Sequence, residues 1–66
     1  MKLDKLKGKM RERDVTQLKC SNELGISLEA FNKKINGKVE FSVREAEMLG
    51  NYLNLSDNEK VDIFLN

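Results

Sequence analysis

The chain has 66 residues, which is enough for one small domain that buries about 60% of the surface exposed by its unfolded form. With one cysteine, no histidine and no proline, its composition suits a helical protein and excludes a disulfide framework or a zinc site built from cysteine and histidine. The formal net charge of +1 argues, taken alone, against a nucleic-acid binder. No apolar run approaches the roughly 18 residues of a membrane span, and the charged segment 1–10 lacks the apolar core of a signal peptide.

The first expected helix runs from Lys2 to about Glu12. Leu3, Leu6 and Met10 recur at helical spacing and form one apolar stripe. Six basic side chains surround this stripe, at Lys2, Lys5, Lys7, Lys9, Arg11 and Arg13. We interpret most of them as a solvated face, because charged residues opposite an apolar stripe are typical of an amphipathic surface helix.

The second expected helix begins after Thr16, whose hydroxyl can accept a backbone N–H that the first turn leaves unpaired. Val15 and Cys20 occupy the two positions of a hydrophobic staple around this cap. Leu24 ends the buried side of the helix. Gly25 follows at the position where left-handed backbone, which glycine adopts without steric cost, ends a helix.

The third expected helix follows closely. Ile26 is expected in the core and Ser27 at the N-cap, while Phe31 and Ile35 form one narrow apolar stripe. Asn36-Gly37 then provides a turn signal. A helix with one narrow stripe, held at an angle by a short glycine turn, is typical of a helix-turn-helix. The alternative is an ordinary helical hairpin in a small bundle.

The fourth expected helix begins with a capping box. The Ser42 hydroxyl can accept the Glu45 amide proton, and the Glu45 carboxylate can accept from the Ser42 amide. Ala46, Leu49 and Leu53 recur at helical spacing after it. The sequence therefore predicts a helix that extends to about Leu53.

A second capping box, Ser56 to Glu59, begins the last expected helix. Val61, Phe64 and Leu65 recur at i, i+3 and i+4 and are expected to face inward. Ile63 does not belong to this stripe and is expected to be exposed. An exposed Ile63 on the C-terminal helix would offer a small contact surface, which predicts a weak homodimer.

Several short motifs between residues 16 and 38 also resemble those of a known family. They are Thr16-Gln17, Cys20-Ser21, Leu24-Gly25-Ile26-Ser27, Phe31 and Asn36-Gly37-Lys38. In these motifs and their spacing the chain resembles the phage Cro proteins and the DNA-binding domains of lambda-type repressors, over nearly its whole length. Three positions depart from that pattern: Cys20 stands where leucine is usual, Ser21 where alanine is usual, and Lys34-Ile35 replaces an apolar residue followed by glutamate.

The resemblance implies one all-α domain, residues 1–66, with a five-helix lambda-repressor-like fold and a helix-turn-helix at about residues 16–37. It also implies a sequence-specific transcriptional regulator of phage or prophage origin that occupies a double-stranded DNA operator, without a cofactor, on the nucleoid in a bacterial cytoplasm. The charge distribution agrees with this function. Residues 1–38 carry ten Lys and Arg against five Asp and Glu, whereas residues 39–66 carry two against six.

Base-reading residues are expected at the start and on the outer face of the second motif helix, which would enter the major groove. By position and by resemblance they are Ser27, Leu28, Glu29, Asn32 and Lys33. Leu28 suits a thymine methyl and Glu29 a cytosine amino group, while Asn32 suits adenine and Lys33 guanine. Structural explanations also exist, because Glu29 is favourable at any helix N-terminus and single exposed leucines are common.

Phosphate contacts are expected from residues that position the protein without reading sequence. Gln17, at the first turn of its helix, resembles the phosphate-binding glutamine of the family. Lys34, Asn36 and Lys38 are candidates for the opposite strand, and one or two basic residues of the first helix for flanking phosphates. Simple surface solvation explains each of these residues equally well.

The sequence bears on two other classes of function. An enzyme is not expected, because the chain has no histidine, Cys20 lies on an apolar side, and caps explain the carboxylates at helix starts. The competing class is a protein-interaction module of the same fold that binds and modulates a repressor. The near-zero net charge, the acidic residues 39–66 and Glu29 on the reading face favour that alternative, as do the expected exposed apolar residues Leu28 and Ile63.

Overall fold

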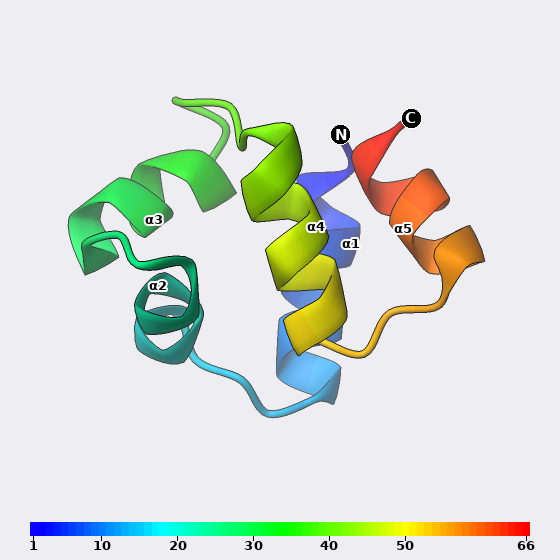
Figure 1. Ribbon diagram of the computed structural model, residues 1–66, viewed down its shortest axis with the longest axis horizontal. Coiled ribbons are helices and arrows are strands. Elements are labelled where there is room, and N and C mark those ends of the chain that lie inside the picture. Colours follow the sequence, from blue (N-terminus) through cyan, green and yellow to red (C-terminus); the bar gives the residue numbers. More distant parts are fainter.

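Five α-helices and no strands make up the computed structural model, which describes residues 1–66 (Figure 1). The helices are α1 (Leu3–Glu12), α2 (Gln17–Leu24), α3 (Leu28–Ile35), α4 (Val43–Tyr52) and α5 (Asp57–Phe64). The all-α class and the five helices are confirmed, with boundaries within one residue of those expected. None of the helices is both long and apolar enough to cross a bilayer.

The helix starts are those that the caps predict. The Thr16 hydroxyl accepts the Lys19 amide proton at 3.1 Å, and the Ser27 hydroxyl accepts the Ala30 amide proton at 3.0 Å. Ser42 and Ser56 both complete reciprocal capping boxes with the glutamates three residues later. Gly25 ends α2 in left-handed backbone, with φ at 70°, as expected for a residue without a side chain.

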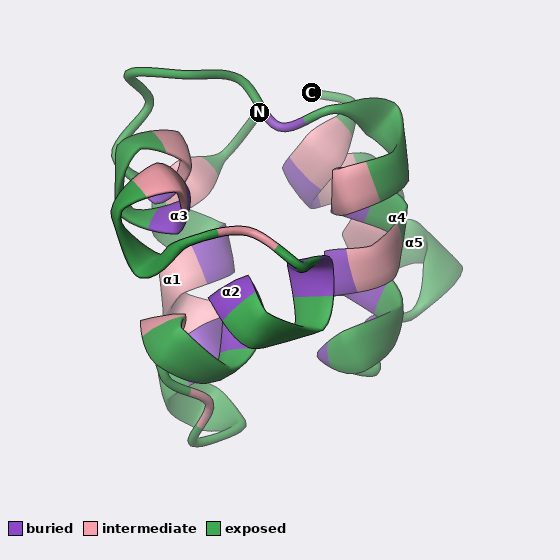
Figure 2. Ribbon diagram, turned by 60° about the vertical axis from the view of Figure 1, so that its left-hand side comes forward, coloured by how far each residue is buried: buried purple, intermediate pink, exposed green.

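The core lies around α4, which packs on α2 at one side and on α5 at the other (Figure 1). Buried residues line the inward side of each helix, and the outward sides are exposed (Figure 2). Phe31 and Phe41 meet edge to face, with ring centroids 5.8 Å apart, and so anchor α3 against the segment before α4. The core comprises Leu6, Met10, Cys20, Leu24, Phe31, Ile35, Phe41, Leu49, Leu53, Leu55 and Ile63.

Cys20 and Ser21 occupy buried positions of α2. Burial raises the pKa of the Cys20 thiol to about 11, so the sulfur remains a neutral, packed group at physiological pH. The Ser21 hydroxyl donates to the Leu18 carbonyl at 2.8 Å, which satisfies its hydrogen-bonding capacity inside the core. Cys20 and Ser21 are therefore both accommodated without an unpaired buried polar atom.

The prediction for α5 was wrong. Ile63 is only 2% exposed and belongs to the core, whereas Val61 and Leu65 lie on the surface and Phe64 is half-buried. Helix α5 has only eight residues, so its sequence contains too few turns to distinguish the expected apolar stripe from a second face that contains Ile63. That second face also carries acidic side chains, which pair with lysines of α1. Because Ile63 is buried, it cannot form the expected contact surface of a homodimer.

Candidate nucleic-acid interface

The helices α2 and α3 are joined by a three-residue turn, Gly25 to Ser27. The Ile26 amide donates to the Ser21 carbonyl at 3.0 Å, and the Ile26 side chain packs on the edge of the core. Phe31 and Ile35 are fully buried, which holds one side of α3 against the molecule. The opposite side of α3 is therefore exposed at one end of the protein (Figure 1).

The five expected base-reading residues are all exposed, but only Glu29 and Lys33 lie opposite the buried stripe. Leu28 precedes Phe31 by three positions and is exposed because it stands at the N-terminal end of the helix. We call these five exposed residues the outer face of α3: Ser27, Leu28, Glu29, Asn32 and Lys33. The Ser27 hydroxyl is committed as a cap acceptor but keeps its own proton to donate. Lys33 Nζ lies 3.5 Å from Glu29 Oε1, in an exposed ion pair one helical turn apart. Such a pair contributes little free energy, so an incoming partner can replace it at small cost.

Gln17 and Asn32 are joined across the turn. The Asn32 Nδ2 donates to the Gln17 Oε1 at 3.3 Å, so the first turn of α2 contacts the middle of α3. This contact leaves the Gln17 amide group free to donate and the Asn32 carbonyl oxygen free to accept. Together the two side chains present a donor and an acceptor in fixed relation at the edge of the outer face of α3.

Lys34 does not lie on this face. Its Nζ contacts Glu45 Oε1 at 2.8 Å and lies 3.4 Å from the Glu40 carbonyl oxygen. Burial raises the pKa of the Glu45 carboxyl, but hydrogen bonds from Lys34 and from the Ser42 amide outweigh this effect and lower it. Lys34 thus joins α3 to α4, and the structure gives this lysine a partner other than the expected phosphate.

Asn36 and Lys38 lie just beyond the C-terminal end of α3 and are exposed. The Lys38 amide donates to the Lys33 carbonyl at 2.9 Å, and Gly37 between them has a φ of 80°. No acidic side chain pairs with Lys38. Both side chains are therefore exposed just after the last turn of α3.

Two basic residues of α1 join this neighbourhood, and sequence reasoning did not single them out. Lys7 Nζ donates to Asn36 Oδ1 at 3.1 Å, across 29 positions of sequence. Lys7 and Arg11, one turn apart, line a hollow of about 220 Å³ together with Gln17 at the start of α2. Their spacing was a usable signal, because residues at i and i+4 share one side of a helix.

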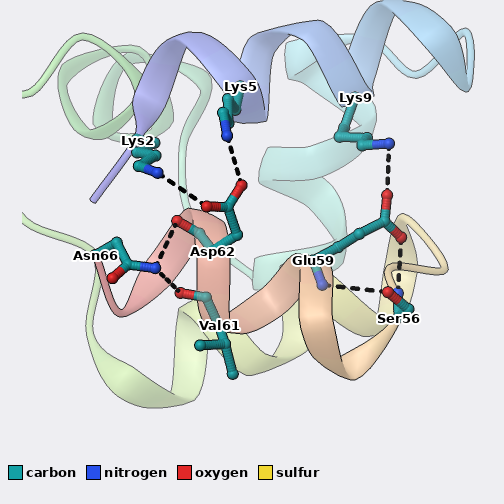
Figure 3. Close-up of polar contacts among 8 residues, drawn as sticks. All are labelled: Lys2, Lys5, Lys9, Ser56, Glu59, Val61, Asp62 and Asn66. Atoms are coloured by element: carbon teal, nitrogen blue, oxygen red, sulfur yellow. Dashed lines mark hydrogen bonds and ion pairs between the residues drawn. The ribbon is translucent and has the colours of Figure 1, made fainter.

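The remaining lysines of α1 face the other way, toward α5 (Figure 3). Lys2 and Lys5 contact the two carboxylate oxygens of Asp62 at 2.8 and 2.6 Å, and Lys9 pairs with Glu59. Hydrogen bonds from Lys2 and Lys5 lower the pKa of the Asp62 carboxyl to about 2. Ion pairs between α1 and α5 thus neutralise part of the positive charge of residues 1–38, away from α3.

Four side-chain cations within residues 1–38 have no acidic partner: Lys7, Arg11, Lys19 and Lys38. No three carboxylate or thiol side chains gather closely enough to hold a metal ion. The residues around α3 can thus donate and accept hydrogen bonds and attract anions, through groups that are exposed and held by a rigid scaffold.

Comparison of the chain with protein-family models, with curated proteins and with solved structures found no match. The class that the structure itself defines is an all-α domain of five helices.

Proposed function

We propose that this protein is a sequence-specific DNA-binding regulator with a lambda-repressor-like helix-turn-helix, in which α3 enters the major groove of a double-stranded operator. One observation carries the proposal. The outer face of α3 presents an exposed apolar group, a carboxylate, an amide and an ammonium within two turns, while Phe31 and Ile35 anchor the helix in the core. This is the range of side-chain chemistry that reads base edges.

Each exposed group of α3 has a matching base edge. Leu28 can contact a thymine methyl, and Lys33 can donate to the acceptor atoms of guanine. Glu29 can accept from a cytosine amino group; it also repels phosphate, so its position favours a site with cytosine there. The Asn32 Nδ2 donates to Gln17 Oε1, and this hydrogen bond fixes the orientation of the Asn32 side-chain amide. Its carbonyl oxygen remains free to accept a hydrogen bond from adenine.

Phosphate binding is assigned to residues around α3. Gln17, Asn36 and Lys38 flank the reading helix, and the N-terminus of α2 adds backbone N–H groups that favour an anion. We add Lys7 and Arg11 to this set, because they line the hollow beside Gln17 and have no acidic partner. Lys34 is left out because it is paired with Glu45.

Operator occupancy is sufficient for regulation, because a protein bound over a promoter excludes polymerase or a competing repressor. The resemblance to Cro-type proteins supports this role and a phage or prophage origin. Action on the nucleoid in a bacterial cytoplasm is part of the same proposal.

Binding-site selection from random duplex DNA, at a stated salt concentration, tests the proposal. We expect enrichment of one short motif. The logarithm of the binding constant for that motif should fall linearly with the logarithm of the salt concentration. Failure to enrich any motif, with no salt-dependent binding to duplex DNA, would contradict DNA recognition.

The second candidate function is a protein-interaction module directed at a repressor. The observation that favours it is an exposed apolar surface on α4 and α5, which DNA recognition by α3 does not use. The salt titration separates the two functions. A purely protein-directed module has no counterions to release from DNA and shows no such slope.

A further inference from the structure

Glu29 and Lys33 lie on the side of α3 that is farthest from the core. Phe31 and Ile35 are fully buried and so fix the rotation of the helix about its own axis. Residues four positions apart share one side of a helix, which places Glu29 and Lys33 next to each other and opposite the buried stripe. When α3 enters a groove, these two side chains therefore lie closest to its floor.

The two side chains have only each other as charged partners. Lys33 Nζ lies 3.5 Å from Glu29 Oε1, and the side chains are 53% and 82% exposed, respectively. Because water screens the pair, both groups keep unused capacity for hydrogen bonds to a further partner. They form a neutral unit in which a carboxylate that only accepts stands beside an ammonium that only donates.

This unit is complementary to the edge of one G·C base pair. In the major groove guanine presents two acceptors, N7 and O6, and cytosine presents its N4 amino group as a donor. Guanine O6 and cytosine N4 are hydrogen-bonded to each other, so they lie about 3 Å apart. The distance between Lys33 Nζ and Glu29 Oε1 is similar. An ammonium on the guanine acceptors would therefore leave the carboxylate beside the cytosine amino group.

We propose that Glu29 and Lys33 read one G·C base pair together, as a single specificity-determining unit. This inference rests on the proposed function and deepens it. Lys33 donates to N7 and O6 of the guanine, and Glu29 accepts from the N4 amino group of the cytosine paired with it. The ion pair can persist in this arrangement, because an ammonium has several protons and a carboxylate several lone pairs.

Joint reading also removes a repulsion that Glu29 would meet alone. A carboxylate at the cytosine amino group lies close to O6 of the paired guanine, and both groups are acceptors. With Lys33 on that oxygen, each polar group at the edge of the base pair faces a group of opposite character. Reading of two separate base pairs would leave Glu29 beside an unmatched oxygen.

Other base pairs match the unit less well. An A·T pair has its amino group between two acceptors, adenine N7 and thymine O4, so the carboxylate would be repelled on both sides. A C·G pair presents its donor and acceptors in reverse order, opposite to the order of Glu29 and Lys33 along α3. The unit therefore selects both the kind of base pair and its orientation.

Binding constants for the selected operator and its single-base-pair variants test this proposal. We expect Glu29→Gln and Lys33→Met each to lower the preference for G·C about tenfold, and to do so at the same position. The double variant should lose little more than either single variant, because both groups act on one base pair. Glu23→Gln is the matched control, since Glu23 on α2 is also exposed and has no ion-pair partner. It should keep the full preference.

Circular dichroism confirms that each variant keeps its helical content. Relaxed preference at two different positions, additive losses in the double variant, or an operator with no required G·C pair would overturn joint reading. An equal loss of preference in Glu23→Gln would also overturn it. In each of these cases the protein still selects an operator, so the proposed function stands. A protein that selects no sequence contradicts the proposed function itself.

Discussion

Lys34 Nζ lies 2.8 Å from Glu45 Oε1, and this ion pair joins the last turn of α3 to the first turn of α4. Both side chains are largely shielded from solvent. Glu45 at the same time accepts the Ser42 amide proton at 2.8 Å. One carboxylate thus begins α4 and fixes the end of the helix to which we assign base reading.

Lys34→Ala tests this connection through stability. The substitution leaves the Glu45 carboxylate partly buried with only its Ser42 partner, so we expect a loss of about 1–3 kcal/mol in the free energy of unfolding. Urea denaturation measures it. Lys38→Ala, on an exposed residue without an ion pair, is the control and should change stability by less than about 0.5 kcal/mol. If the two variants are equally stable, the ion pair does not hold α3 to α4.

Acid should destabilise the contact between α1 and α5. The pKa of the Asp62 carboxyl falls from 3.8 to about 2 on folding, and that of Glu59 falls from 4.5 to about 2, mainly through hydrogen bonds from Lys2 and Lys9 respectively. A carboxyl with a depressed folded pKa stabilises the folded state above its unfolded pKa, and this contribution is lost as pH falls toward the folded value. Thermal midpoints should therefore decrease between about pH 4.5 and pH 2.

Asp62→Asn isolates the part of this loss that Asp62 contributes. The variant should have a lower midpoint at neutral pH and a smaller further decrease in acid than the unmodified protein. Asp4→Asn is the control, because Asp4 lies on the same helix as the lysines but has no ion-pair partner. An acid profile of Asp62→Asn that parallels the unmodified protein would show that the pairs do not stabilise α5.

Lys33→Ala and Gln17→Ala separate base reading from phosphate binding. We expect Lys33→Ala to cost about 1–3 kcal/mol on the selected operator and to relax preference at one base position. Gln17→Ala should weaken binding to all sequences alike, because a phosphate contact carries no sequence information. Repeating the site selection with each variant checks both statements. A loss of specificity in Gln17→Ala alone would reverse the two roles.

Lys7→Ala and Arg11→Ala test the phosphate contacts that we add on α1. Each should reduce the magnitude of the slope of log K against log salt by about one. Lys5→Ala is a matched control, because Lys5 lies on the same helix but contacts Asp62 of α5. Equal slopes for all three variants and the unmodified protein would place α1 away from the DNA.

The sequence by itself determined the local structure. Thr16, Ser27, Ser42 and Ser56 cap groups only three residues away, so their spacing alone predicts where four helices begin. Gly25 likewise ends α2 through its own backbone conformation. The exposed face of α3 was predictable for a related reason, because the buried stripe of an eight-residue helix specifies the opposite side.

Only the tertiary structure decided which side of α5 is buried. Two faces of this helix carry apolar residues, one with Val61 and one with Ile63, and periodicity favoured the first. The second is buried because Asp62 beside it meets Lys2 and Lys5, which lie at the other end of the chain. A sequence pattern within one helix contains no information about such a distant partner.

The same reason explains which basic residues remain near α3. Lys34 and Lys38 look alike in the sequence, yet α4 supplies Glu45 to the first and no acidic partner to the second. Lys7 and Lys5 differ by two positions in α1, and that rotation directs one to Asn36 and the other to Asp62. Helical spacing divides such residues between two sides, but the packing of the helices determines what each side meets.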